Sequence, residues 1–267
     1  MNRLDKKRLC IFLVAIFVLC LFGCQKQTGN KDVVYEDMKE HFEKANLLSA
    51  NIGIVSKTEK DDSVSYGEFG SGVIIENKDG YYYALTAAHV VSVANAQFLV
   101  FTANTEMKEE KIPGYDEMTI LAQETYDSMY PAEVMYVSER DDLAVIRFST
   151  GEELSIADIA NKDPEKGERI LCIGNPQNEW FAISYGTILS GIEKFGEYQG
   201  FLSNGMKHSA YMQVGSSGGA AYNEDMKLTG ITPAAGLSLD GKDFSYGILI
   251  PVSEINLCLE NWKNNAK

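Results

Sequence analysis

The hydrophobic and polar positions along the chain fall into three patterns. Residues 10–22 form an unbroken apolar run close to the start. Residues 33–48 carry apolar side chains every three or four positions, with Glu and Lys between them, which predicts an amphipathic helix. From residue 50 onward, short apolar runs alternate with Gly, Asn and Asp, residues that favour turns, so this part of the chain is expected to consist of β-strands.

The region after residue 50 contains many segments with strand character. The predicted strands are Asn51–Val55, Gly70–Glu76, Tyr81–Thr86, Gln97–Phe101, Ala132–Ser138, Leu143–Phe148, Arg169–Ile173, Phe181–Ser190, Ala210–Val214, Leu228–Thr232 and Phe244–Ile250. Many short strands separated by turns are typical of β-sandwiches and β-barrels. A closing helix is predicted at residues 251–263, where apolar positions again recur at helical spacing.

Two polar stretches interrupt the predicted strands. Residues 103–130 are acidic and are expected to form a long surface loop that can include a helical turn, with the chain reversing at Pro113-Gly114. Residues 149–167 are polar and would join two halves of similar size. The sequence shows no internal repeat that would indicate a solenoid.

The first residues resemble a targeting segment. The first eight carry four basic side chains and precede the apolar run 10–22, an arrangement typical of a secretory signal. The run is too short to span a membrane comfortably. It ends in Leu21-Phe22-Gly23-Cys24, which resembles the lipobox of bacterial lipoproteins, where the signal is cut before a Cys that then carries lipid.

This resemblance predicts a lipoprotein signal peptide at residues 1–23, lipidation of Cys24 and a flexible tether over residues 24–32. The mature chain would then sit on the extracytoplasmic face of a bacterial cell membrane, held there by the lipid. Two alternatives remain open, an uncleaved anchor helix and a plain signal that is cut elsewhere.

Charge and cysteine usage exclude several classes of partner and cofactor. The formal net charge of −14 argues against nucleic-acid binding and against adsorption to a bare anionic bilayer. After the signal and Cys24, only Cys172 and Cys258 remain, and both lie in apolar runs that predict buried free thiols. A disulfide between them is the alternative in an extracytoplasmic setting. No Cys or His spacing indicates zinc, so neither a metal nor a cofactor is expected.

Three short motifs carry the candidate chemistry, and they occur in the order His, Asp, Ser. His89 lies in Thr-Ala-Ala-His-Val after a predicted strand, Asp142 in Asp-Asp-Leu-Ala-Val before another, and Ser217 in Gly-Ser-Ser-Gly-Gly. This order is that of the chymotrypsin class of catalytic triads. Asp141 is the neighbouring alternative to Asp142.

Each residue type has a chemical reason in this arrangement. The Ser217 hydroxyl is a weak nucleophile until a base removes its proton, and imidazole titrates near neutral pH. A carboxylate fixes the tautomer of such an imidazole and stabilises its charged form. The backbone N–H groups of Gly215 and Ser217 would form an oxyanion hole, since glycine permits the tight turn that aims them at one point.

With these motifs, the chain resembles the trypsin-like peptidases, and most closely their HtrA branch. Four further segments carry the resemblance: Gly70-Ser71-Gly72-Val73-Ile74-Ile75, Cys172-Ile173-Gly174-Asn175-Pro176, Tyr185-Gly186-Thr187-Ile188-Leu189-Ser190 and Tyr246-Gly247-Ile248-Leu249-Ile250-Pro251. The resemblance implies an all-β fold of two six-stranded antiparallel barrels, with an N-terminal and a C-terminal helix. The peptidase domain would span residues 33–267, with the first barrel at about 50–150, the second at about 166–252 and the site between them.

The resemblance also implies a substrate pocket. Its floor would be formed by Tyr211, Met212 and Gln213, and its walls by Thr232, Ala234, Gly236 and Gly247. No acidic residue occurs among them, so small or medium apolar side chains are expected before the cleaved bond rather than Arg or Lys. His208 lies close by and is either a substrate contact or a surface histidine, whereas His41 is a surface or packing residue.

The chain departs from the HtrA pattern at two points. Ser216 stands where that branch usually has Asn and digestive enzymes have Asp, so activation by a salt bridge from a new N-terminus is not expected. No PDZ domain is expected to follow, because the sequence stops at Lys267.

These features predict an endopeptidase that acts on extended or unfolded polypeptides, with the oligomeric state left open. A sensing or binding protein on the same fold, with silent or switchable catalysis, is the second hypothesis. A structural surface lipoprotein with a vestigial triad is the third.

Overall fold

The computed structural model describes residues 35–61, 63–112, 115–176, 179–195, 204–237 and 243–265. The predicted signal peptide (1–23), the tether (24–32) with Cys24, and the predicted turn at Pro113-Gly114 lie outside the described residues.

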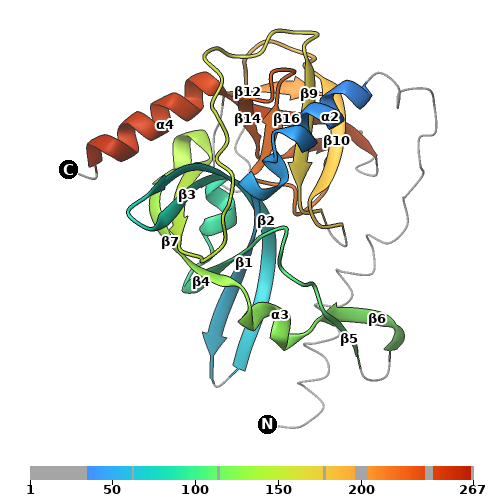
Figure 1. Ribbon diagram of the computed structural model, residues 1–267, viewed down its shortest axis with the longest axis vertical. Helices are drawn as coiled ribbons and strands as arrows, with labels where there is room; N and C mark the ends of the chain where they lie inside the picture. The colour runs from blue at the N-terminus through green and yellow to red at the C-terminus, as the bar shows by residue number, and fades with distance from the viewer. Residues whose placement is uncertain are drawn as a thin grey trace.

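Six antiparallel strands form a closed barrel in the order β1-β2-β3-β8-β7-β4 (Figure 1). Their bounds are β1 (Asn51–Lys60), β2 (Ser63–Lys78), β3 (Tyr81–Thr86), β4 (Ala96–Phe101), β7 (Tyr130–Ser138) and β8 (Leu143–Phe148). This confirms the first predicted barrel. The hairpin of β1 and β2 is longer than the apolar pattern indicates, because its outer half pairs through the backbone without burying side chains.

The second half of the chain forms a curved eight-stranded sheet, in the order β10-β9-β13-β14-β16-β12-β11 with β15 beside β16. The bounds are β9 (Arg169–Gly174), β10 (Ala182–Thr187), β11 (Glu193–Lys194), β12 (Asn204–His208), β13 (Gly219–Tyr222), β14 (Leu228–Thr232), β15 (Ala235–Leu237) and β16 (Phe244–Pro251). The sheet curls until an isolated antiparallel bridge joins Ile188 to His208. The expectation of a second closed barrel is therefore met only in part, since a bridge and not a full ladder joins these strands.

Both predicted terminal helices are present. α2 (Glu36–Lys44) is shorter than its apolar pattern, because Asn46 adopts a left-handed backbone (φ 51°) and a 3-10 turn, η2 (Leu47–Ala50), follows. α4 (Val252–Asn265) closes the chain and runs alongside the first barrel in Figure 1. In the described part of the chain, no helix is long and apolar enough to cross a membrane.

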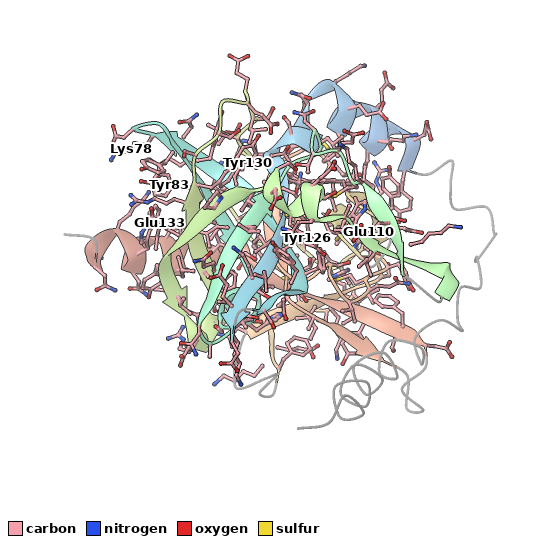
Figure 2. The ribbon with its side chains drawn as sticks, turned by 90° about the horizontal axis from the view of Figure 1, so that it is seen from below. Lys78, Tyr83, Glu110, Tyr126, Tyr130 and Glu133 are labelled. Atoms are coloured by element: carbon pink, nitrogen blue, oxygen red, sulfur yellow. The ribbon has the colours of Figure 1, made fainter. Side chains whose placement is uncertain are left out.

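The acidic stretch 103–130 was expected to be a loop that can include a helical turn, and this prediction is correct only for the helical turn. It contains a two-stranded hairpin of β5 (Glu109–Ile112) and β6 (Tyr115–Leu121), followed by α3 (Gln123–Asp127). Among the described strands, β5 and β6 form a two-stranded sheet of their own and pair with no other strand. In Figure 2, Glu110 and Tyr126 are seen toward the side of the molecule where the β5–β6 hairpin lies, whereas Tyr83 and Glu133 are seen toward α4.

Two strand assignments in the second half also differ from the prediction. Ala210–Val214 was expected to be a strand, but the strand lies earlier, at β12, and residues 211–213 have no regular structure. β13 was not predicted, because its Gly-Ala-Ala-Tyr sequence lacks the β-branched residues that indicate strands.

One apolar cluster joins the two sheets, and strand alternation explains how it forms. On β8, Leu143 and Val145 face this shared cluster, while Ala144 and Ile146 face the inside of the first barrel. The shared cluster also receives Phe42 from α2 and several side chains from α4. Both helices therefore seal the seam between the two halves.

The cysteines agree with the prediction of buried free thiols. Cys172 on β9 and Cys258 on α4 are both buried and not bonded to each other. Burial raises the pKa of Cys258 to about 12 and raises that of Cys172 further, so both remain protonated.

Candidate functional site

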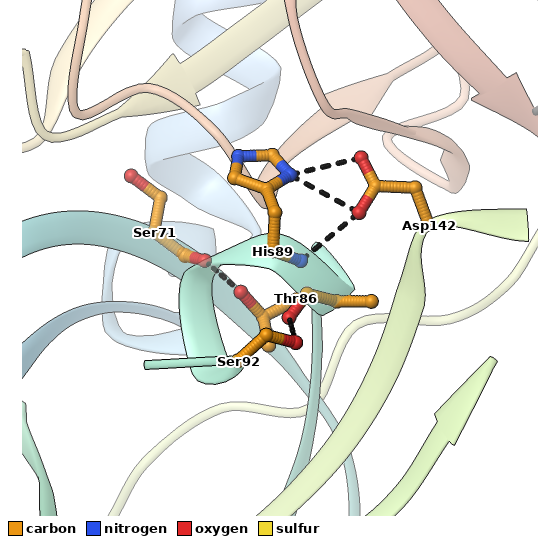
Figure 3. A network of polar contacts seen from close by, with 6 residues as sticks. Ser71, Thr86, His89, Ser92 and Asp142 are labelled. Carbon is orange, nitrogen blue, oxygen red and sulfur yellow. Dashed lines mark hydrogen bonds and ion pairs between the residues drawn. The ribbon is translucent and has the colours of Figure 1, made fainter. Parts of the chain in front are cut away.

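His89 and Asp142 form a buried pair on segments that connect strands of the first barrel. His89 lies in a 3-10 turn, η3 (Ala88–Val91), directly after β3. Its Nδ1 lies 2.9 Å from Asp142 Oδ2 and 3.1 Å from Oδ1, and its backbone N–H donates to Oδ1 at 3.0 Å (Figure 3). The carboxylate therefore holds both the ring and the backbone of His89.

The geometry determines which ring nitrogen carries the proton. An ionised carboxylate can only accept hydrogen bonds, so His89 Nδ1 must donate to Asp142. In the neutral imidazole, Nε2 is then left with the lone pair. The pair can accept a proton at Nε2, as a general base requires.

The backbone at Asp142 is left-handed, with φ 49° and ψ 42°. This conformation is uncommon outside glycine, although Asp tolerates it better than most residues. It occurs where the 3-10 turn η4 (Glu139–Asp141) ends and β8 begins. The turn separates the two neighbouring carboxylates: Asp141 accepts hydrogen bonds from Ser138 Oγ at 2.7 Å and Arg140 Nε at 2.8 Å, so only Asp142 faces the histidine.

Residues 213–216 form a tight turn in the second half of the chain. The Ser216 N–H donates to the Gln213 carbonyl at 3.0 Å, and Gly215 stands third in the turn with φ +97°. A positive φ at this position marks a type II turn. A Cβ at Gly215 would lie 2.2 Å from the Asn175 carbonyl oxygen, so only glycine fits.

The N–H groups of this segment include both used and unused hydrogen-bond donors. Those of Ser216, Gly218 and Gly219 donate to carbonyls at 2.8–3.0 Å. Among the residues that the structure describes, the N–H groups of Gly215 and Ser217 have no acceptor. Two unpaired donors beside one serine can bind a developing negative charge.

Gly218 brings Ser217 next to the segment that carries His89. A Cβ on Gly218 would lie 2.2 Å from Ser71 O, 2.3 Å from Thr86 Oγ1 and 2.8 Å from the backbone N of Ala87, two residues before the histidine. Within the described ranges, the Ser217 hydroxyl has no hydrogen-bond partner. Hydrogen bonds between a nucleophile and its base are often long in the absence of substrate.

Ser71 connects the two halves of the site, which the sequence did not indicate. It lies on β2 with 1% exposure, and its N–H donates to the Ser217 carbonyl at 2.8 Å. Its carbonyl accepts a hydrogen bond from Thr86 Oγ1 at 2.7 Å, one of the contacts drawn in Figure 3. A small polar residue between two glycines, directly before the apolar run Val73-Ile74-Ile75, was the available signal.

The predicted substrate-pocket residues fall into two groups. Tyr211, Met212, Gln213 and Thr232 line a cavity of about 70 Å³ that reaches Ser216 behind the turn.

The other three pocket residues, Ala234, Gly236 and Gly247, lie on or beside the paired strands β15 and β16 and do not line this cavity. The ring of Tyr246 occupies the space beside Gly236, and the ring of His208 occupies the space beside Gly247.

His208 is fully buried, so it is neither a surface residue nor exposed to substrate in this structure. In the described part of the molecule, neither of its ring nitrogens makes a hydrogen bond of good geometry, although backbone groups of Ile248 and Ala210 lie near the ring. Burial lowers the pKa of His208 to about 4, since a charged ring would lack solvation there. His41, by contrast, is exposed on α2.

Among the described residues, no group of three or more His, Cys, Asp or Glu side chains could hold a metal ion. The described residues place the segment of the carboxylate-held imidazole against Gly218, in a turn that also carries a serine and two backbone N–H groups without an acceptor. Residues of these types are the ones used in acyl transfer through a serine ester.

Comparisons with known proteins agree with this geometry. Residues 70–231 match the family described as trypsin-like peptidase domain. A "Serine protease HtrA-like" of Staphylococcus aureus (strain USA300) is 27% identical over 242 residues, covering 83% of this chain and 28% of that protein. The protein of the same name from strain MRSA252 has the same identity and coverage. The chain thus spans less than a third of the length of these curated relatives.

The buried His208 predicts a specific dependence of stability on pH. Its pKa is about 4 in the folded state and about 6.5 when unfolded, so the unfolded chain binds the proton first as the pH falls. The free energy of unfolding should therefore decrease from pH 7 to pH 4. Urea titrations at pH 7 and pH 4 measure this decrease in the free energy of unfolding. In His208→Leu the decrease should be smaller than in wild type by roughly 3 kcal/mol.

His41→Gln, which alters an exposed histidine, is the control and should leave the pH dependence unchanged. Parallel stability curves for the wild type and His208→Leu would contradict the assignment.

Proposed function

Because this chain belongs to the family of trypsin-like peptidases, we propose that it is a serine endopeptidase with Ser217 as nucleophile. His89 acts as the general base, and Asp142 orients it. Ser217 attacks the scissile carbonyl while His89 Nε2 takes the hydroxyl proton. His89 then returns that proton to the leaving amine, and water releases the acyl group by the same steps in reverse.

The observation that carries the proposal is the pairing of Asp142 with both the ring and the backbone N–H of His89. A solvated surface histidine would have no such double anchor. The unused N–H groups of Gly215 and Ser217 support the second requirement, a site for the oxyanion. The type II turn at Gly215 favours a competent enzyme over a silent binding protein, because these donors are not consumed by internal hydrogen bonds.

The second sheet supports the finer architecture. We infer that β9, β10, β12, β13, β14 and β16 act as the second six-stranded barrel, with the bridge from Ile188 to His208 joining its ends. The site then lies between the barrels, since His89 and Asp142 come from the first and Ser217 from the second. Tyr211, Met212, Gln213, Thr232, Ala234, Gly236 and Gly247 remain the proposed substrate-pocket residues.

Extended or unfolded polypeptides are the proposed substrates. The printed name of the relatives, a serine protease, supports a peptide bond as the reactive group. None of the proposed floor residues Tyr211, Met212 and Gln213 is acidic, which favours an apolar side chain before the cleaved bond, although Glu179 also lines this cavity.

We further propose that the enzyme is a lipoprotein attached through Cys24 to the extracytoplasmic face of a bacterial membrane. The support is the basic start, the apolar run and the Leu-Phe-Gly-Cys sequence. Attachment would keep the peptidase near the membrane at the end of a short tether.

The nucleophile assignment predicts selective labelling by a fluorophosphonate probe. Ser217→Ala should abolish labelling, because the probe reacts only with a serine activated by a base. Ser216→Ala is the matched control, since Ser216 is the adjacent serine and its hydroxyl lies 3.4 Å from the Gln213 N–H, within the turn. Folded wild-type protein that neither labels nor cleaves casein would rule out the proposal.

The two adjacent carboxylates provide a second matched pair. Asp142→Asn should lower kcat about 10⁴-fold, because an amide no longer enforces the required tautomer of His89. Asp141→Asn should keep kcat within about threefold of wild type, since Asp141 contacts Ser138 and Arg140 instead. Equal losses in the two variants, measured on a peptide ester, would contradict the assignment.

The lipid anchor predicts that Cys24→Ser moves the protein from the membrane fraction to the soluble fraction. An alkyne-labelled fatty acid should be incorporated into the wild type and not into this variant. Cys172→Ser, which changes a buried cysteine, should still incorporate the label. Incorporation into Cys24→Ser would point to a different anchor.

A further inference from the structure

Ser71 contacts the turn of Ser217 at two points, although it belongs to the other barrel. Its Oγ donates to the Gly215 carbonyl at 2.8 Å, and its N–H donates to the Ser217 carbonyl at 2.8 Å. The N–H groups of Gly215 and Ser217 themselves have no acceptor among the described residues. One buried serine therefore binds both residues of the proposed oxyanion hole.

The planarity of the peptide bond explains the effect of these two contacts. Fixing the Gly215 carbonyl fixes the peptide plane between residues 215 and 216, and fixing the Ser217 carbonyl fixes the plane between 217 and 218. The N–H of Ser217 belongs to the plane between these two, and that of Gly215 to the plane just before them. Rotation of either donor away from the substrate would disturb an anchored plane.

The direction of the Ser71 hydroxyl is itself determined by its neighbours. Its oxygen accepts hydrogen bonds from Asn175 N at 2.8 Å and from Asn175 Nδ2 at 3.2 Å. A hydroxyl has two acceptor positions and one donor, so its single proton is directed to the Gly215 carbonyl. The Asn175 side chain is held in turn by Phe181 N–H and by the Ile52 carbonyl.

The same residue connects the turn to the histidine segment. The Ser71 carbonyl accepts the Thr86 hydroxyl, and Thr86 precedes His89 by three residues at the end of β3. We propose that Ser71 is a positioning residue, which holds the oxyanion turn in register with the base. This inference rests on the proposed peptidase function and adds a residue that acts through the turn without touching substrate.

Steady-state kinetics of Ser71→Ala on a peptide substrate test the proposal. Without the hydroxyl, the Gly215 carbonyl and the backbone N–H of Asn175 lose a partner, and the peptide plane between residues 215 and 216 loses its anchor, while the Ser71 N–H still holds the Ser217 carbonyl. The variant should lose about 10- to 100-fold in kcat, with KM within about twofold of wild type, because the affected donors act mainly in the transition state. A peptidyl boronate, which mimics that state, should lose affinity in parallel.

Ser56→Ala is the matched control. Ser56 is also a buried serine of the first barrel, and its hydroxyl donates to the Gly67 carbonyl on the neighbouring strand, away from the turn. Both variants should show a lowered melting temperature, but only Ser71→Ala should lose kcat. A kcat of Ser71→Ala within twofold of wild type, or an equal loss in Ser56→Ala, would overturn the proposal.

A conservative variant covers the case in which Ser71→Ala does not fold. Ser71→Cys keeps a weaker hydrogen-bond donor of similar shape. If Ser71→Ala folds, the kcat of Ser71→Cys should lie between those of wild type and Ser71→Ala. If Ser71→Ala does not fold, the kcat of Ser71→Cys should still be clearly below that of wild type. A kcat of Ser71→Cys equal to that of wild type would contradict the proposal.

An inactive wild type would refute the peptidase assignment and leave the structural part of the inference testable. A crystal structure of Ser71→Ala, or of Ser71→Cys, would then decide it. Loss of the positive φ at Gly215 would support the positioning role in the turn, and an unchanged turn would overturn it.

Discussion

The site depends on the close approach of two backbone segments at Gly218. At this position, the Ser71 carbonyl, the Thr86 hydroxyl and the Ala87 nitrogen of the first barrel occupy the space that a side chain would need. Any side chain there would push the two halves apart by more than a hydrogen bond can tolerate. The adjacent Ser217 is thereby brought beside the His89 segment, and the hydrogen bonds of Ser71 lock the contact.

The two halves contribute different kinds of rigidity to this contact. The first barrel is a closed ladder, and it holds His89 and Asp142 through backbone as well as side-chain bonds. The second half contributes a turn whose conformation depends on glycine at 215 and on a neighbouring barrel for support. The base is thus fixed by its own barrel, while the turn is fixed across the interface. Any force that shifts the barrels would reach the turn first.

The interface is sustained by apolar burial more than by polar contacts. The shared cluster takes alternate residues from strands of both halves, and α2 and α4 cover its ends. Phe42 of α2 packs edge-on against Tyr222 of β13, at 5.6 Å between ring centroids. Since hydrophobic burial is the dominant favourable term in folding, this shared core makes the position of the site a consequence of folding itself.

The sequence alone determined the strand-rich character of the chain, the two terminal helices and the strands of the first barrel. It also identified His89, Asp142 and Ser217 as candidate site residues. These follow from periodicity and from motifs in which a few adjacent residues carry the signal. The tertiary structure paired His89 with Asp142 and not with Asp141, buried His208, paired the acidic hairpin and placed Ser71 in contact with the turn of the second half. Each of these depends on partners that are distant along the chain, and one residue's neighbours in sequence do not specify which backbone groups it will meet in space.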